Sequence, residues 1–194
     1  MLKKTILALI LIVSTASAKM LVFTTIFPLY DAAKNIAKEK ADVQNLVPFG
    51  VEAHDFEPKA KDMANLTKSD ILVTSGEVFE PWSKKIISSL GIKNKTLDMS
   101  TKVNLLKPKN EAQTHGGYDP HYWLSIDNQI TTAKEIAAAF AKKDPQNAKT
   151  YNDNALSYIA KLNELKKEYG AIKTCKNKKI IVNHDAFGYL SHEY

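Results

Sequence analysis

The chain has 194 residues and a formal net charge of +6, and 25% of its residues are charged, so it is mildly basic. Its lysines are scattered among acidic residues rather than concentrated in one stretch, which argues against a protein that binds nucleic acid. The single cysteine, Cys175, excludes an intrachain disulfide. In an oxidising compartment such a lone thiol is buried, paired with another chain, or missing its partner.

Residues 1–18 have the pattern of a secretory signal peptide. Lys3 and Lys4 precede an apolar run over residues 6–13, and Ala16 and Ala18 are small residues before a cleavage point. The run is much shorter than the roughly 20 residues that span a bilayer, and no cysteine follows it to carry a lipid. We expect an exported, soluble, periplasmic protein whose mature chain begins at Lys19. Cleavage would remove two lysines and no acidic residue, lowering the net charge from +6 to +4.

The first half of the mature chain alternates strand-like and helix-like patterns. Expected strands are residues 20–26, 43–47 and 71–74, with short candidates at 96–99 and 103–106; expected helices are 30–40, 58–69 and 79–90. Such alternation is typical of an α/β fold, with a parallel sheet covered by helices on both faces. Ligand sites in these sheets lie in loops beyond the carboxyl ends of the strands.

The second half begins with the stretch DPHYWL, residues 119–124. Asp119 and Pro120 indicate a helix start, which would hold His121 on a stiff backbone, with Tyr122 and Trp123 shielding it from water. Two helical patterns follow, and the second, residues 145–169, would extend about 37 Å at 1.5 Å per residue. Residues 178–182 are then expected to form one more buried strand, leading into Asn183-His184-Asp185.

Three of the five histidines share one setting. His54, His121 and His184 each follow a predicted strand or turn and have a carboxylate or proline beside them. They could form the ligand set of a divalent metal; imidazole suits zinc, whose tetrahedral geometry would leave a fourth position for water or a carboxylate. Alternatively, each is a buried histidine bonded to a neighbour. The carboxylates that could accept hydrogen bonds from the ligand rings are Asp55, Glu57 and Asp185.

Other candidate residues carry weaker signals. His115 is expected to be a solvated loop residue with at most a transient metal contact, and His192 has no assigned role. Glu77 and Glu80 could be a catalytic acid pair, but acidic residues before Pro81 favour a solvated helix start. The sequence contains no HExxH, phosphate-loop or GxSxG motif.

The motifs GVEAHDFEP, SDILVTSGEVFEPW, DPHYWL and IIVNHDAFGYL occur in this order. Together they resemble the periplasmic zinc-binding proteins of ABC importers, the cluster A-I or family 9 metal-binding solute receptors. The resemblance implies two α/β lobes joined by a long helix, with metal bound in the cleft by His54, His121 and His184. Manganese-binding relatives have a carboxylate at the position of His184, so the resemblance favours zinc over manganese. It also implies an inner-membrane ABC permease as partner, and we expect a monomer.

Two departures from the family stand out. The polar stretch at residues 107–117 is shorter than the histidine-rich loop of many zinc receptors, and the family continues through a whole second lobe. We therefore expect a C-terminally truncated chain: an α/β lobe over 19–143, a linker helix over 144–174 and the beginning of an incomplete second lobe over 175–194. The fourth ligand and a partner for Cys175 would then lie in the absent part.

These observations favour a non-enzymatic receptor that captures zinc and passes it to a permease. The first alternative is an exported zinc-dependent hydrolase, in which three histidines activate a bound water; no residue stands at a recognisable spacing for its general base. The second alternative is an adhesin-like exported domain with incidental metal binding.

Overall fold

The computed structural model describes residues 18–107 and 117–194. The predicted signal peptide, apart from Ala18, and His115 lie outside the described residues. In chain order the strands and helices are β1 (Met20–Thr24), α1 (Phe27–Ala37), β2 (Ala41–Asn45), α2 (Ala60–Lys68), β3 (Ile71–Thr74), α3 (Pro81–Ser89), β4 (Thr96–Asp98), α4 (Ile126–Lys143), α5 (Ala148–Tyr169) and α6 (Gly188–Glu193). The 3₁₀ helices are η1 (Lys93–Lys95), η2 (Met99–Thr101), η4 (Tyr122–Leu124), η5 (Pro145–Asn147) and η6 (Gly170–Thr174).

The four strands form a parallel sheet in the order β2-β1-β3-β4. In the central strand β1, Val22 is in register with Val43 of β2 and Ile71 of β3. Parallel strands need crossover connections, and α1 supplies the first of them, while α2 and α3 follow in the next two connections. The α/β fold with a parallel sheet is therefore confirmed.

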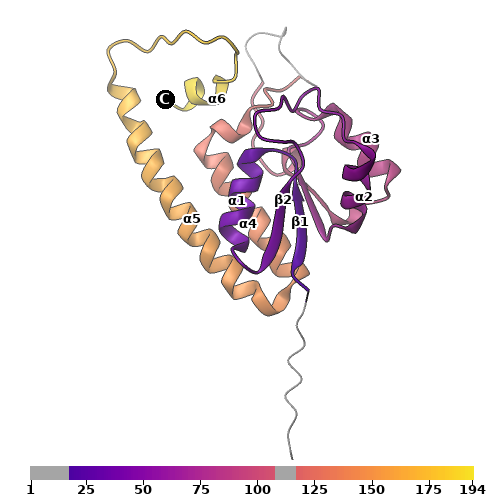
Figure 1. Cartoon of the computed structure of the whole chain (residues 1–194). Helices are drawn as coiled ribbons and strands as arrows, with labels where there is room; N and C mark the ends of the chain where they lie inside the picture. Colours follow the sequence, from indigo (N-terminus) through magenta and orange to yellow (C-terminus); the bar gives the residue numbers. More distant parts are fainter. Residues whose placement is uncertain (1–17, 108–116) are drawn as a thin grey trace, which may run out of the picture.

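Helices cover both faces of the sheet, as the apolar runs of its strands predict. Val22, Val43 and Val73 belong to one core, to which α1 and α4 contribute. Phe23 and Leu72 point to the opposite face and pack with Leu66 of α2 in a second, smaller core. Figure 1 shows α1, α4 and α5 on one side of the strands and α2 and α3 on the other. This frame brings the carboxyl ends of all four strands to one edge.

The long helix α5 packs along the α/β lobe. Tyr151 is fully buried against Phe140 of α4, with ring centroids 5.5 Å apart. Asn154 donates a hydrogen bond to the Ile36 carbonyl of α1 at 2.9 Å. Farther along, Leu156 and Leu165 are exposed. The predicted long helix is present, and its first half belongs to the core of this lobe. Within the described ranges, no helix is both long and apolar enough to span a membrane.

Two of the expected strands are wrong. Residues 103–106 and 178–182 have irregular backbone, and Ile180 and Ile181 are 63% and 102% exposed rather than buried. Both runs are apolar, but a strand also needs a neighbour for its backbone groups, and neither run pairs with one of the four strands. Other element boundaries differ by a few residues; α3 begins at Pro81 rather than at residue 79, since proline favours the first helical turn.

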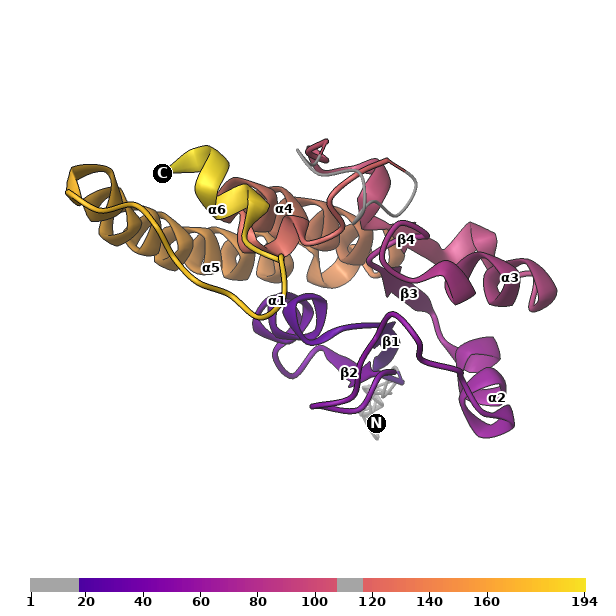
Figure 2. The ribbon, with the colours of Figure 1, turned by 90° about the horizontal axis from the view of Figure 1, so that it is seen from above.

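The C-terminal segment returns to the lobe. Figures 1 and 2 show the chain leaving the end of α5, crossing the molecule as an irregular segment and finishing as the short helix α6. Tyr189 in α6 is 2% exposed, and Glu193 accepts a hydrogen bond from Ser125, which caps α4. Because α6 is anchored, His184 lies on a segment that is attached to the lobe on both sides.

Candidate metal centre

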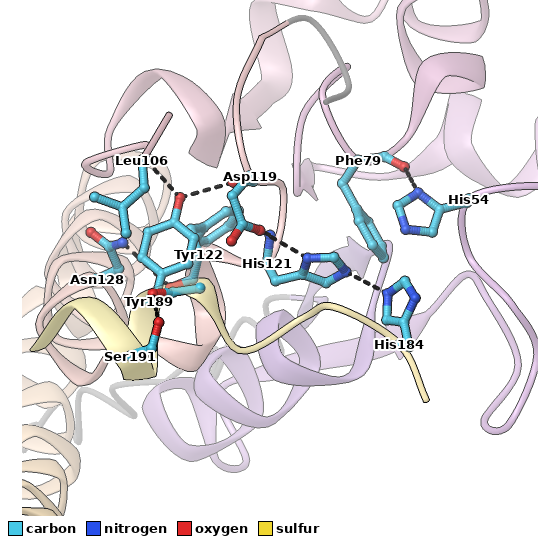
Figure 3. Close-up of polar contacts among 11 residues, drawn as sticks. His54, Phe79, Leu106, Asp119, His121, Tyr122, Asn128, His184, Tyr189 and Ser191 are labelled. Atoms are coloured by element: carbon cyan, nitrogen blue, oxygen red, sulfur yellow. Dashed lines mark hydrogen bonds and ion pairs between the residues drawn. The ribbon is translucent and has the colours of Figure 1, made fainter. Parts of the chain in front are cut away.

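The structure brings His54, His121 and His184 together at the carboxyl edge of the sheet. One ligand nitrogen from each ring can be chosen so that all three lie within 4.8 Å of one another. The three rings come from the loop after β2, the residue before η4 and the segment before α6, and Figure 3 shows them facing one another. Zinc bonds to imidazole of about 2.0–2.1 Å place ligand nitrogens about 3.3 Å apart in a tetrahedron, so only a small contraction separates this cluster from such a site.

His54 is half-buried in a loop that the start of α3 holds in place. Its Nδ1 lies 3.0 Å from the Phe79 carbonyl oxygen, and its ring packs on the Phe79 ring at 4.1 Å between centroids. Trp82 donates from Nε1 to the carbonyl of Ala53, the residue before His54, at 3.0 Å. A carbonyl can only accept, so Nδ1 of His54 carries the proton and Nε2 is the unprotonated ring nitrogen.

His121 is the most buried of the three, at 7% exposure. One oxygen of Asp119, Oδ1, accepts both the backbone N–H and Nδ1 of His121, each at 2.9 Å. This carboxylate fixes the tautomer with the proton on Nδ1 and leaves Nε2 as the acceptor or ligand atom. Trp123 and Phe79 pack edge-on to the ring, at 5.4 and 6.1 Å between centroids, so the predicted aromatic surroundings are present, although Tyr122 points into the core.

The structure shows Asp119 in a second role, as the acceptor that orients the His121 ring. Asp119 was expected to cap a helix, and Asp55, Glu57 and Asp185 were the expected acceptors for the rings. In the structure the acceptors at Nδ1 of His54 and His121 are the Phe79 carbonyl and Asp119. The spacing of Asp119 and His121 is the one signal that could have revealed this pair, because an aspartate commonly bonds the backbone N–H two residues later.

His184 is exposed and completes the cluster from the C-terminal segment. Its Nε2 lies 3.0 Å from Nε2 of His121. Since the His121 proton is on Nδ1, His184 donates from Nε2 in this metal-free arrangement. To bind a metal through that atom, His184 must move its proton to Nδ1 or release it, whereas Nε2 of His54 and of His121 carries no proton.

Glu80 follows Phe79 in the chain and is buried, so the prediction of a solvated helix start is wrong for its side chain. Glu80 is fully buried and accepts a hydrogen bond from the Ser75 backbone N–H at 3.2 Å. Burial raises the pKa of its carboxyl group to about 8, outweighing the opposing hydrogen bonds from Thr25, Ser75 and Gly76. Its neighbour Glu77 is exposed and pairs with Lys84 at 2.9 Å. The two acids therefore do not form a catalytic pair.

An apolar groove of about 390 Å³ adjoins the histidine cluster. It is lined by Ala53, Phe79 and Trp123 near the cluster and by the exposed Phe27 and Phe49 farther out. A larger groove of about 630 Å³ lies around residues 18–20 and 143–147, near the amino-terminal ends of the strands, and contains none of the three histidines.

A parallel α/β lobe with three imidazoles gathered at the carboxyl edge of its sheet is the architecture of a small-ligand-binding lobe. The family model described as zinc-uptake complex component A, periplasmic (ZnuA), matches residues 22–194. The chain belongs to this family.

Curated relatives agree with this assignment. The high-affinity zinc uptake system protein ZnuA of Bacillus subtilis is 37% identical over 187 residues, which cover 91% of this chain and 59% of the relative. The zinc-binding protein AdcA of Streptococcus pyogenes serotype M3 is 33% identical, with 92% of this chain and 39% of the relative covered. The chain thus spans less than two thirds of the length of these relatives.

Solved structures show the same fold. The metal-dependent lipoprotein YcdH from Bacillus subtilis superposes with a TM-score of 0.82 at 37% identity, covering 91% of this chain and 64% of that one. Zn(II)-bound AdcA from Streptococcus pneumoniae has a TM-score of 0.82 at 32% identity, with 91% and 38% covered. FpvC from Pseudomonas aeruginosa, solved in complex with Mn²⁺, has a TM-score of 0.76 at 30% identity, with 91% and 66% covered.

Proposed function

We propose that this protein is the receptor of a zinc uptake transporter, which captures Zn²⁺ outside the cytoplasm and passes it to an ABC permease in the inner membrane. The observation that carries the proposal is the convergence of His54, His121 and His184 within 4.8 Å. Zinc is the cargo, so the protein needs affinity, selectivity and release, and no chemical step. Membership of a zinc-uptake family and zinc-binding relatives support this function.

His54, His121 and His184 are the proposed ligands, each through a ring nitrogen. In this assignment Asp119 and the Phe79 carbonyl hold the rings of His121 and His54 in the tautomer with the proton on Nδ1. Water or a carboxylate takes the fourth position of the tetrahedron. Residues 175–194 are proposed to begin a second lobe, and they carry His184, the one exposed ring of the three.

Nitrogen donors favour zinc over manganese. Carboxylate and water oxygens suit Mn²⁺, whereas imidazole suits Zn²⁺, and Mn²⁺ is the weakest binder of the divalent first-row series. One relative of the same fold was solved with Mn²⁺. Comparing the binding of Zn²⁺ and Mn²⁺ therefore tests directly whether the ligand atoms are imidazole nitrogens.

Equilibrium dialysis of the metal-stripped protein tests the proposal. We expect one Zn²⁺ bound per chain, with Mn²⁺ failing to displace it at equal concentration. An adhesin-like domain with incidental metal binding would retain no stoichiometric Zn²⁺, and that result would contradict the receptor function. Zinc-dependent hydrolysis of ester or peptide substrates would instead support the hydrolase alternative.

Asp119 should contribute to the affinity for Zn²⁺ because its carboxylate orients the His121 ring. Replacing Asp119 with alanine removes the acceptor that orients His121, and groups in this position typically contribute about 10- to 100-fold to metal affinity. We expect a loss in that range when Zn²⁺ binding is measured by competition with a chromogenic chelator. The control is Asp153→Ala on α5, which removes an exposed carboxylate paired with Lys149 and should leave affinity unchanged. An equal effect of the two substitutions would count against the role of Asp119.

A further inference from the structure

The hydroxyl group of Tyr189 joins two chain segments next to the histidine cluster. It donates a hydrogen bond to the Asp119 carbonyl at 2.9 Å and accepts one from the Leu106 backbone N–H at 3.0 Å. The Asp119 N–H in turn bonds the Leu106 carbonyl at 2.8 Å. Tyr189 therefore completes a closed set of hydrogen bonds around Asp119 (Figure 3), the residue that orients His121.

The residue before Tyr189 approaches the same aspartate from another side. A Cβ atom built on Gly188 would overlap Oδ2 of Asp119, so only a glycine fits while the carboxylate keeps its position. Oδ2 is thus confined by the Gly188 backbone, and Oδ1 is directed to His121. The two residues at the start of α6 fix both the main chain and the side chain of Asp119.

Gly188 and Tyr189 also set the position of His184. The chain before His184 is irregular and exposed at Ile180 and Ile181, so it makes little contact that could place the ring. Tyr189, at 2% exposure, is the first deeply buried side chain after His184. Burial raises the pKa of the Tyr189 hydroxyl to about 12, so the group stays a proton donor throughout the physiological range.

We propose that Gly188 and Tyr189 act together as a positioning element of the metal centre, which locks His121 through Asp119 and presents His184 to it. One short helix start then couples two ligands that are far apart in the sequence. This inference rests on the proposed zinc binding. It also predicts which ring nitrogen of His121 carries the proton in the metal-free protein, and this tautomer can be measured independently of zinc.

Tyr189→Phe removes the hydroxyl and keeps the buried ring. We expect Zn²⁺ affinity to fall about tenfold in chelator competition, within the range that groups supporting metal ligands contribute. In ¹⁵N NMR of the metal-free protein, His121 should lose its single tautomer and show exchange between Nδ1–H and Nε2–H. The matched control is Tyr151→Phe, which also removes a hydroxyl from a fully buried tyrosine, in this case one bonded to Asp144 at 2.7 Å.

A second pair of variants tests the close approach of Gly188 to the Asp119 carboxylate. Gly188→Ala should displace the Asp119 carboxylate and lower Zn²⁺ affinity at least about tenfold. Gly170→Ala is the control, because a Cβ atom there meets no other atom within 4 Å and φ is not in the positive region. Both pairs are compared with wild type by thermal unfolding without metal, so that a general loss of stability is recognised.

The outcomes separate the two proposals. A purely structural role would give Tyr189→Phe and Tyr151→Phe similar shifts in unfolding temperature, wild-type Zn²⁺ affinity and an unchanged His121 tautomer, and this result would overturn the inference. If wild-type protein fails to bind Zn²⁺, the proposed function fails. The NMR comparison would then still decide whether Tyr189 holds His121 in one tautomer.

Discussion

Replacing His121 with alanine is expected to lower the affinity for Zn²⁺ by more than about 100-fold. The loss of a direct ligand should exceed the 10- to 100-fold contribution of the groups that orient ligands. His121 is the most buried of the three rings and lies next to both of the others, with centroids 6.0 Å from His54 and 4.9 Å from His184. The measurement is chelator competition with Zn²⁺ on the metal-stripped protein.

His54→Ala and His184→Ala should also weaken Zn²⁺ binding strongly. The loss of affinity should be smaller for His184→Ala, because the His184 segment is exposed and its ring must give up the Nε2 proton. His192→Ala is the control, since His192 lies on α6 but is exposed and outside the cluster. His115→Ala is likewise expected to have little effect. Small and equal losses for all five variants would mean that the site is misassigned.

The position of the histidine cluster could be predicted because it follows from chain topology. Parallel strands end at one edge of the sheet, so His54 and His121, each placed in a loop after a strand, had to lie on the same side. This argument needs only the alternation of apolar runs and helices. It holds even though β2 begins and ends two residues earlier than expected.

The contacts around Asp119 could not be predicted in the same way. Tyr189 bonds the Asp119 carbonyl across 70 positions of the chain, and no local pattern specifies such a partner. The expected strand at residues 178–182 failed for a related reason: its apolar run satisfies the strand pattern, but pairing depends on a neighbour elsewhere. Local patterns identify which segments are apolar, and tertiary contacts decide what they pack against.

Glu80 differs in the opposite direction: the sequence predicts a solvated side chain, and the fold buries it. Gly76, with φ of 103°, allows a tight turn after β3, and the Glu80 N–H bonds the Gly76 carbonyl at 2.8 Å. This turn folds the Glu80 side chain back toward Ser75, where Tyr122 also bonds Ser75 at 3.2 Å. An acidic residue just before a helix is normally solvated, so the sequence alone favoured the wrong environment.

The burial of Glu80 should make the stability of the protein depend on pH. Its pKa is raised from 4.5 to about 8, by burial first and with Asp98 adding repulsion. Between these two values the folded protein holds a proton that the unfolded chain releases. The contribution of Glu80 is therefore fully retained below about pH 4.5 and is lost as the pH rises toward 8, with a slope of at most about 1.4 kcal/mol per pH unit.

Glu80→Gln should remove this dependence, because glutamine reproduces the shape and neutral charge of the protonated acid. We expect the free energy of unfolding of the variant, relative to wild type, to increase steadily from pH 5 to pH 8 in urea denaturation of the metal-free protein. Glu77→Gln is the control: Glu77 is exposed and paired with Lys84, so this variant should follow the wild-type profile. Parallel profiles for wild type and Glu80→Gln would show that Glu80 is ionised in the folded state. If the wild type instead loses stability relative to Glu80→Gln as the pH falls below about 4.5, the buried carboxylate is stabilised as an anion, with the hydrogen bonds from Thr25, Ser75 and Gly76 outweighing the cost of its burial.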